Sequence, residues 1–222
     1  DSNRAGDDGD VSNYLASDVL EIYSTEQSFA ALKKDGSVVT WGKGADDLNT
    51  ETLEALSSGV KEIQQSRKTF VAYKEDGKAV LWAESEVFET GYSQIIEGPV
   101  KNISLATQGS LSLIEFTDGT FKFNNFPDSP RQKFTSNGKE LIIKEIIDTR
   151  YGSCLLTSTG SLFYIPSNHY FISINPWNNP NGPKDPFEID PSQLIGTAEN
   201  NVKKVISTAV SYTHLRAHET VV

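Results

Sequence analysis

The sequence predicts an all-β protein built from tandem repeats of short antiparallel strands. Three observations predict it: a pattern that recurs every 40 or so residues, a glycine turn at a fixed place in each repeat, and strand-like runs around that turn. The turn glycines Gly36, Gly77, Gly119 and Gly160 are separated by 41, 42 and 41 residues. The flanking runs are rich in Val, Ile, Phe and Tyr and have no helical period. Short strands at this period are typical of a β-propeller, in which each sheet buries one face against the next.

Each repeat has the same order of parts. A V-x-x-I motif opens it, an apolar run leads to an Asp-Gly or Thr-Gly turn, and a second apolar run follows. Glycine between two apolar runs predicts a tight hairpin, because the turn needs a positive φ. We expect the tail of a preceding repeat at 1–18, repeats at 19–59, 60–99, 100–142 and 143–201, and the start of a truncated repeat at 202–209.

A short helix is expected between the first two repeats, over Thr50–Leu56. Leu53 and Leu56 are three residues apart, a spacing typical of a helical turn. Gly59 follows at a position typical of a helix stop.

The fourth repeat contains an insertion at 166–201 that is rich in proline and asparagine, so we expect no regular element through most of it. Long loops on rigid scaffolds often carry function, and aromatic side chains are favoured anchors at interfaces. The alternative is a surface insertion whose aromatic side chains fold back on the sheet. The candidate partner-binding residues are His169, Tyr170, Phe171, Trp177 and Phe187.

Composition excludes several classes of protein. The 222 residues include 20 Lys and Arg and 30 Asp and Glu, giving a net charge of −10. An acidic chain argues against nucleic acid or an anionic membrane as partner. No apolar run approaches the ~20 residues of a membrane span. The single cysteine, Cys154, excludes a disulfide framework and lies in an apolar run, which predicts a buried structural thiol.

We find no motif for catalysis, a cofactor or a metal. A phosphate-binding glycine loop, a nucleophile elbow and a dinucleotide-binding glycine motif are all missing from the sequence. The acidic run Asp7–Asp10 does not fit a calcium loop, since Asn13 and Val19 stand where that loop needs Gly and Glu. The periodic Trp41 and Trp82 are interpreted as packing residues.

The residues at 210–220 read VSYTHLRAHET, identical to a translation of a common transposase-type sequencing adapter. We therefore expect 210–222 to be an adapter-derived artefact outside the fold. On this interpretation His214, His218 and Glu219 do not form a metal site, although their spacing suits one on a helix.

The repeat pattern closely resembles the RCC1 (regulator of chromosome condensation) type. Residues 19–42 carry almost all of it, with F-A-A-L-K-K-D-G-S-V-V-T-W-G after V-L-E-I, and residues 60–82 carry most of it. In the third and fourth repeats Asn124 and Ile165 stand in place of the tryptophans. The resemblance implies antiparallel four-stranded blades of a seven-bladed propeller. The chain would then be a partial RCC1-like propeller of about four blades plus two fragments.

The resemblance also implies a function. We expect a non-enzymatic protein-binding scaffold, a fragment of a larger bacterial RCC1-repeat protein that is secreted or at the cell surface. Its partners would be an unknown protein and the remaining repeats of the same full-length chain. Two alternatives stay open: guanine-nucleotide exchange on a small GTPase, and an enzyme acting on glycans, which would need a convergent pair of carboxylates.

Overall fold

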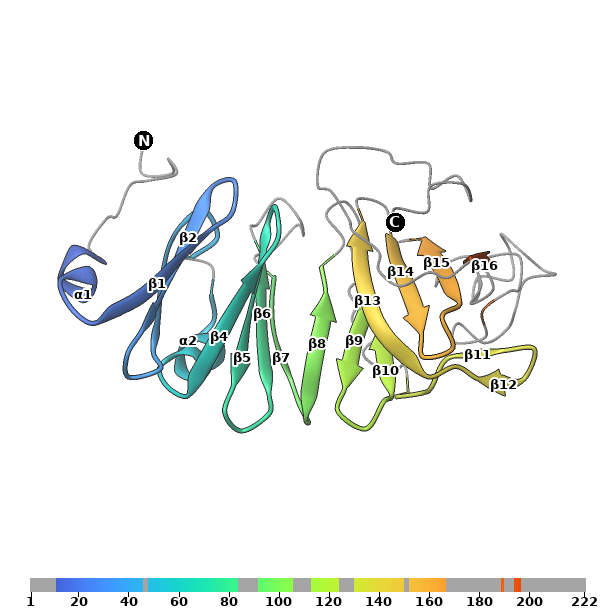
Figure 1. The fold of residues 1–222 in the computed structure, drawn as a ribbon. Coiled ribbons are helices and arrows are strands. Elements are labelled where there is room, and N and C mark those ends of the chain that lie inside the picture. Colours follow the sequence, from blue (N-terminus) through green and yellow to red (C-terminus); the bar gives the residue numbers. More distant parts are fainter. Residues whose placement is uncertain are drawn as a thin grey trace. The chain divides into compact units, whose positions relative to one another are not determined.

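The computed structural model describes residues 11–45, 48–83, 92–105, 113–123, 130–149, 152–166, 189 and 194–196. These residues form small antiparallel sheets that follow one another along the chain (Figure 1). The predicted fold class is therefore confirmed: the protein is all-β, with the repeated antiparallel sheets of a partial β-propeller. The chain divides into two compact units, Asp1–Lys101 and Asn102–Val222, which are described in turn.

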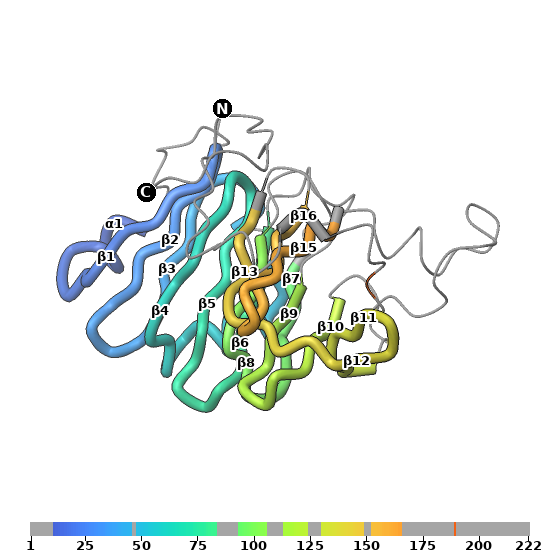
Figure 2. Tube along the Cα trace, turned by 45° about the vertical axis from the view of Figure 1, so that its right-hand side comes forward, coloured from blue at the N-terminus to red at the C-terminus, as the bar shows by residue number. Residues whose placement is uncertain are grey.

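The first unit contains two sheets (Figure 2), and a short helix lies between them in the sequence. Each sheet is a meander, since neighbouring strands in the sheet are also neighbours in sequence. The first sheet follows the helix α1 (Ser12–Leu15) and consists of β1 (Val19–Ser24), β2 (Ser28–Lys33) and β3 (Val38–Gly42). The second follows the helix α2 (Thr50–Leu56) and consists of β4 (Val60–Gln65), β5 (Thr69–Lys74), β6 (Ala79–Ala83) and β7 (Tyr92–Ile96).

The helix α2 occupies the predicted residues, and the side chain of Asn49 caps it by accepting a hydrogen bond from the Thr52 amide at 2.8 Å. Of the two leucines at helical spacing, Leu56 is buried and Leu53 is 48% exposed. The buried side chains are Thr52 and Leu56, four residues apart. The polar side chain of Thr52 can be buried because its hydroxyl has a hydrogen-bond partner: it donates to Ser93 Oγ at 2.8 Å.

A β-bulge explains the V-x-x-I motif. The register between β4 and β5 shifts between Val60 and Glu62, and the same shift occurs between Val19 and Glu21. The extra residue brings Val60 and Ile63 to one face of the strand, although they are three positions apart. Both side chains are buried in a core shared by the two sheets, together with Leu32 of β2.

Backbone hydrogen bonds from the turn glycines join successive parts of this unit. The Val60 amide donates to the Gly36 carbonyl at 2.9 Å, and the Val100 amide donates to the Gly77 carbonyl at 2.8 Å. Gly36 has φ +78°, and a Cβ at this position would lie 3.0 Å from the Gly59 nitrogen. The turn glycine therefore forms the hairpin and also allows the next repeat to approach its backbone.

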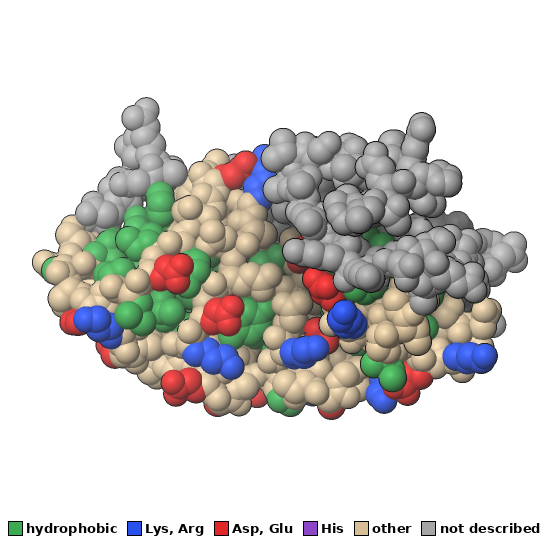
Figure 3. Space-filling view, in the orientation of Figure 1, with side chains coloured by type: hydrophobic (Ala, Val, Ile, Leu, Met, Phe, Trp, Pro, Cys, Tyr) green, Lys and Arg blue, Asp and Glu red, His purple; other side chains and the backbone are tan. Residues whose placement is uncertain are grey.

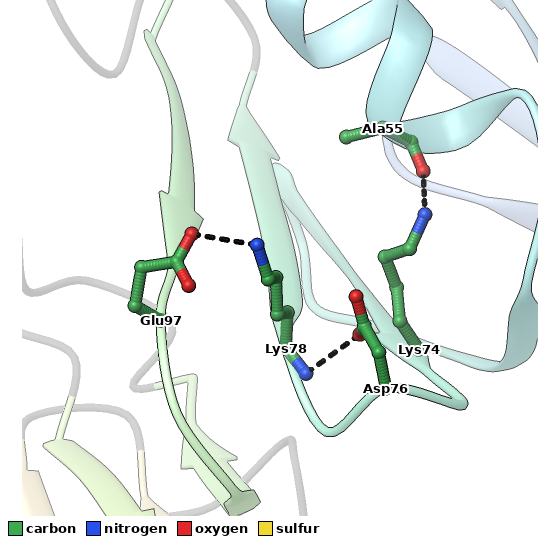
Figure 4. Close-up of polar contacts among 5 residues, drawn as sticks. All are labelled: Ala55, Lys74, Asp76, Lys78 and Glu97. Atoms are coloured by element: carbon green, nitrogen blue, oxygen red, sulfur yellow. Dashed lines mark hydrogen bonds and ion pairs between the residues drawn. The ribbon is translucent and has the colours of Figure 1, made fainter.

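The side chain of Lys74 in the second sheet adds contacts to the end of α2 (Figure 4). The Lys74 ammonium donates to the Ala55 carbonyl and, at 2.7 Å, to the Ser58 carbonyl, both near the C-terminal end of α2. A cation there satisfies carbonyls that the helix leaves unpaired. Nearby, Lys78 lies 3.0 Å from Glu97, and this pairing raises the pKa of Lys78.

The second unit also contains two main sheets, with a small hairpin between them. Between the first sheet and the hairpin, the backbones of Gln132 and Phe121 pair: the Phe121 amide donates to the Gln132 carbonyl at 2.7 Å, and the Gln132 amide donates to the Phe121 carbonyl at 3.0 Å. The chain at Gln132 therefore lies beside the strand that contains Phe121. The first sheet has the order β10-β9-β8, from β8 (Val100–Ser104), β9 (Leu113–Phe116) and β10 (Phe121–Phe123). The hairpin consists of β11 (Thr135–Ser136) and β12 (Lys139–Glu140).

The last sheet runs in the order β13-β14-β15-β16. Its fourth strand lies inside the predicted insertion, and so does the fully buried Ile189, whose amide donates to the Thr135 carbonyl at 2.8 Å. The distal part of the insertion therefore returns to the core. The strands are β13 (Ile143–Thr149), β14 (Gly152–Thr157), β15 (Leu162–Pro166) and β16 (Leu194–Gly196).

Candidate functional site

A buried polar cluster lies at one end of the last sheet. Ser104 ends β8, Asp148 is close to the end of β13, and Ser153 is close to the start of β14. Ser104 Oγ donates to the Asp148 carboxylate and lies 2.7 Å from Ser153 Oγ. The Leu105 amide donates to the same carboxylate at 2.7 Å, and Ser153 Oγ donates to it at 3.3 Å. The carboxylate therefore joins the end of β8 to the sheet β13-β14.

Burial and hydrogen bonding act on Asp148 in opposite directions. Removal from water raises the pKa of this carboxyl, while the hydrogen bonds from Ser104, Leu105 and Ser153 favour its charged form. Burial has the larger effect, so the pKa of Asp148 lies above its ordinary value. All three histidines of the sequence lie outside the described residues, so no described imidazole stands next to Ser104 or Ser153. The described geometry is that of a clamp between strands.

The clamp lies at the end of the sheet where β15 stops, at the first residue of the predicted insertion. Thr149 pairs with Gly152, which in turn pairs with Pro166, the last residue of β15. The predicted binding residues His169, Tyr170, Phe171, Trp177 and Phe187 follow this point and lie outside the described residues, so they stay a prediction.

The sequence analysis missed the clamp, although a signal for it was present. In the first two repeats cross-strand aromatic pairs stack at this end of the sheet, Phe29 on Trp41 at 5.2 Å and Phe70 on Trp82 at 5.1 Å between ring centroids. The fourth repeat pairs Ser153 with Ile165 at the equivalent positions. With Ser153 and Ile165 in place of the two aromatic rings, there is room for a carboxylate. The charged Asp148, which directly follows Ile146 and Ile147 in β13, is the sequence signal that could have indicated the clamp.

Two predicted packing residues are confirmed. Trp82 is buried against Phe70 in the shared core of the first unit. Cys154 is 4% exposed, and burial raises the pKa of its thiol to about 11. The thiol is therefore protonated at neutral pH and is a poor nucleophile.

The described residues contain neither a candidate metal site nor a candidate membrane-spanning helix. Nowhere in the described ranges do three or more His, Cys, Asp or Glu side chains gather in a way that could hold a metal ion. Among the same residues, no helix is long and apolar enough to cross a membrane. The acidic run Asp7–Asp10, the segment 202–209 and the adapter-like residues 210–222 lie outside the described part of the chain.

Comparison with known proteins gives structural similarities alone, since no protein-family model and no curated protein matches the chain. Yeast RCC1 (Prp20), in a complex with Kap60, matches with a TM-score of 0.46 and 16% identity over 82% of this chain and 50% of that chain. Prp20p from Saccharomyces cerevisiae, described with its binding to Gsp1p and histones, gives 0.42 and 17% over 67% and 45%. Human WBSCR16 gives 0.44 and 15% over 68% and 48%.

The chain thus spans about half the length of these solved structures. Similarities this weak do not bear on what the chain does. The fold assignment above rests on the sheets, their registers and the repeat period.

Replacing Asp148 by alanine tests the clamp. The substitution leaves the Leu105 amide without its acceptor, and we expect a loss of about 1–3 kcal/mol in the free energy of unfolding at neutral pH. The loss should be larger in acid. The folded state binds this proton more tightly than the unfolded state, so the contribution of Asp148 falls as pH rises from about 4 through its raised pKa.

Urea unfolding of the wild type and the Asp148→Ala variant across this pH range measures the effect. Glu145→Ala, on the exposed side of β13, serves as the control and should change stability by less than about 0.5 kcal/mol. A loss at Asp148 that grows with rising pH would contradict the direction of the pKa shift.

Proposed function

We propose that the chain is a non-enzymatic, protein-binding scaffold of RCC1-like repeats. On this proposal it belongs to a larger bacterial protein, secreted or displayed at the cell surface, and its partners are a further protein and the remaining repeats of the full-length chain. The charge of −10 makes nucleic acid a poor candidate partner.

One observation carries the proposal: the described residues on either side of the segment 167–188 are both held in the same unit. It leaves β15 after Pro166, beside the Asp148 clamp, and the chain after it is fixed by the buried Ile189. Ser136 Oγ donates to the Ile189 carbonyl at 2.9 Å, and β16 then pairs with β15. Because its flanking residues are held in place, this segment would lose less entropy on binding than a free chain end, which favours its use in binding.

The chemistry of the described groups supports a scaffold more than an enzyme. The thiol of Cys154 is buried and protonated, and the Asp148 carboxylate faces two hydroxyls and an amide. A glycosidase would instead need two carboxyl groups about 5–10 Å apart across a substrate cleft.

A photo-crosslinking experiment tests this function. A photoreactive phenylalanine analogue replaces Trp177, and a control carries it at Leu53, an exposed residue of α2 far from the insertion in sequence. The partner captured at position 177 and not at position 53 is purified, and its affinity is measured by calorimetry. We expect Trp177→Ala to weaken binding by about 30-fold or more, as at an interface anchor, and Leu53→Ala to leave it unchanged.

Two results would overturn the proposal. The first is equal weakening by the two alanine variants, since the insertion would then have no special role. The second is turnover by the wild type, either accelerated release of labelled GDP from a small GTPase or cleavage of a glycan.

A further inference from the structure

The outer edge of β3 has no neighbouring strand in the part of the chain that the structure describes. The pairing of β3 with β2 identifies the backbone groups at this edge. At the turn, the Lys33 amide donates to the Ser37 carbonyl at 2.9 Å. Because bonded pairs alternate along an antiparallel ladder, Val38 and Thr40 direct their amides and carbonyls away from β2. These are the groups that a further strand would bind.

The same edge is covered in the other three repeats. In each of them the residue two positions after the turn glycine, equivalent to Val38, pairs outward with a further segment. These pairs are Ala79 with Ile96, Phe121 with Gln132, and Leu162 with Gly196. After β3 the next described element is instead the helix α2, and the strand after that belongs to the second sheet.

The sequence of β3 does not oppose pairing with another chain. Residues 38–41 include no charge and no proline, the features by which edge strands commonly avoid such pairing. At the opposite edge of the sheet, β1 has an exposed Glu21 and a bulge. The face beside the β3 edge is apolar: Ile22 and Val39 share it, since both lie opposite Ala31. Ile22 is 57% exposed, and hydrophobic side chains are visible at the surface around β1 in Figure 3.

Thr40 gives this edge a chemical preference. Its Oγ1 atom is buried and has no hydrogen-bond partner among the described residues. A buried hydroxyl without a partner is destabilising. The equivalent residue of β6 is the apolar Leu81, which lies opposite Gln94 of β7. An added strand with an amide or a hydroxyl side chain opposite Thr40 would supply the partner.

We propose that the outer edge of β3 binds an extended segment of a partner protein as a fourth antiparallel strand. The backbone of that segment exchanges hydrogen bonds with Val38 and Thr40, as β7 does with β6. Its side chain opposite Thr40 is an amide or a hydroxyl, and its side chain opposite Val39 is apolar. The site lies in the first unit, so it is independent of the insertion in the fourth repeat.

A peptide with the sequence of residues 92–98, YSQIIEG, is the probe, because it contains the strand that pairs with β6. Its binding to the whole chain is measured by fluorescence anisotropy. In the register of β7, the Gln94 amide faces β3, and methylation of its nitrogen removes a donor. We expect binding about 10-fold weaker or more. Methylation at Ile95, whose amide faces away, is the matched control and should change binding by less than about 3-fold.

Thr40→Val tests the side-chain contact, because valine keeps the shape of threonine and removes the hydroxyl. We expect the variant to bind the peptide about 5-fold more weakly. The stability of the chain alone should be unchanged or higher, since a buried hydroxyl without a partner has been removed. Absence of peptide binding to the wild type, unchanged binding by Thr40→Val, or equal weakening by the two methylated peptides would overturn the proposal.

Amide hydrogen exchange in the chain alone tests whether this edge is open. The Thr40 amide should exchange at least about 10-fold faster than the Leu81 amide, which faces β7, and the peptide should slow it. If the Thr40 amide is as slow as the Leu81 amide without peptide, another part of the chain covers β3. If it slows with increasing protein concentration, a second copy is the occupant. Either result would overturn the proposal.

Discussion

Phe70→Ala is expected to lower the free energy of unfolding of the first unit by about 3–5 kcal/mol. The Phe70 ring is 1% exposed and stacks on Trp82 at 5.1 Å with an interplanar angle of 25°. It lies in the core that the two sheets share, so its removal leaves a cavity between them. Urea unfolding followed by tryptophan fluorescence measures the loss.

Phe29→Ala is the matched control, since Phe29 occupies the same position one repeat earlier. Its ring stacks on Trp41 at 5.2 Å, but it is only half-buried. We expect about half the loss seen at Phe70, because less apolar surface leaves water at this site. Equal losses at the two positions would contradict the asymmetry of the first and second sheets.

Gly36→Ala is expected to cost about 2–3 kcal/mol. The left-handed conformation of this residue, with φ +78°, costs an L-amino acid about 1–2 kcal/mol. The new methyl group would also lie 3.3 Å from the nitrogen and from the oxygen of Val60, disturbing the hydrogen bond that joins the repeats. Equilibrium unfolding in urea measures the total.

Gly119→Ala separates these two effects. Gly119 has the same φ of +78°, and a Cβ placed there meets nothing within 4 Å. We expect about 1–2 kcal/mol, the backbone cost alone. If Gly36→Ala costs no more than Gly119→Ala, the contact between the turn glycine and the next repeat contributes nothing.

The features that the sequence predicted are local ones. The turn at Gly36 and the helix at Thr50–Leu56 each depend on a few neighbouring residues, and the structure contains both. In the turn, Asp35 accepts hydrogen bonds from the Ser37 amide at 3.0 Å and from its hydroxyl at 2.6 Å, which lowers the pKa of Asp35. Such contacts within a few residues follow from residue type.

The features that could not be predicted depend on contacts between distant segments. The charge after Ile146 and Ile147 marks Asp148, but Ser104 is 44 residues away in sequence and nothing local identifies it as the partner. Ile22 and Ile63 have the same local pattern and differ only in the neighbour that covers them. For the candidate site the sequence indicated the insertion, while the clamp at its base became visible only in the fold.

Amide hydrogen exchange at Val60 and Val100 tests the central claim most directly, namely that successive repeats are joined through the backbone of the turn glycine. Both amides donate across the joint, to Gly36 and to Gly77. We predict exchange at least about 100-fold slower than in an unfolded chain, and selective acceleration at Val60 in the Gly36→Ala variant. Exchange of both amides at the rate of exposed backbone groups would contradict the joint and the stacking of repeats that depends on it.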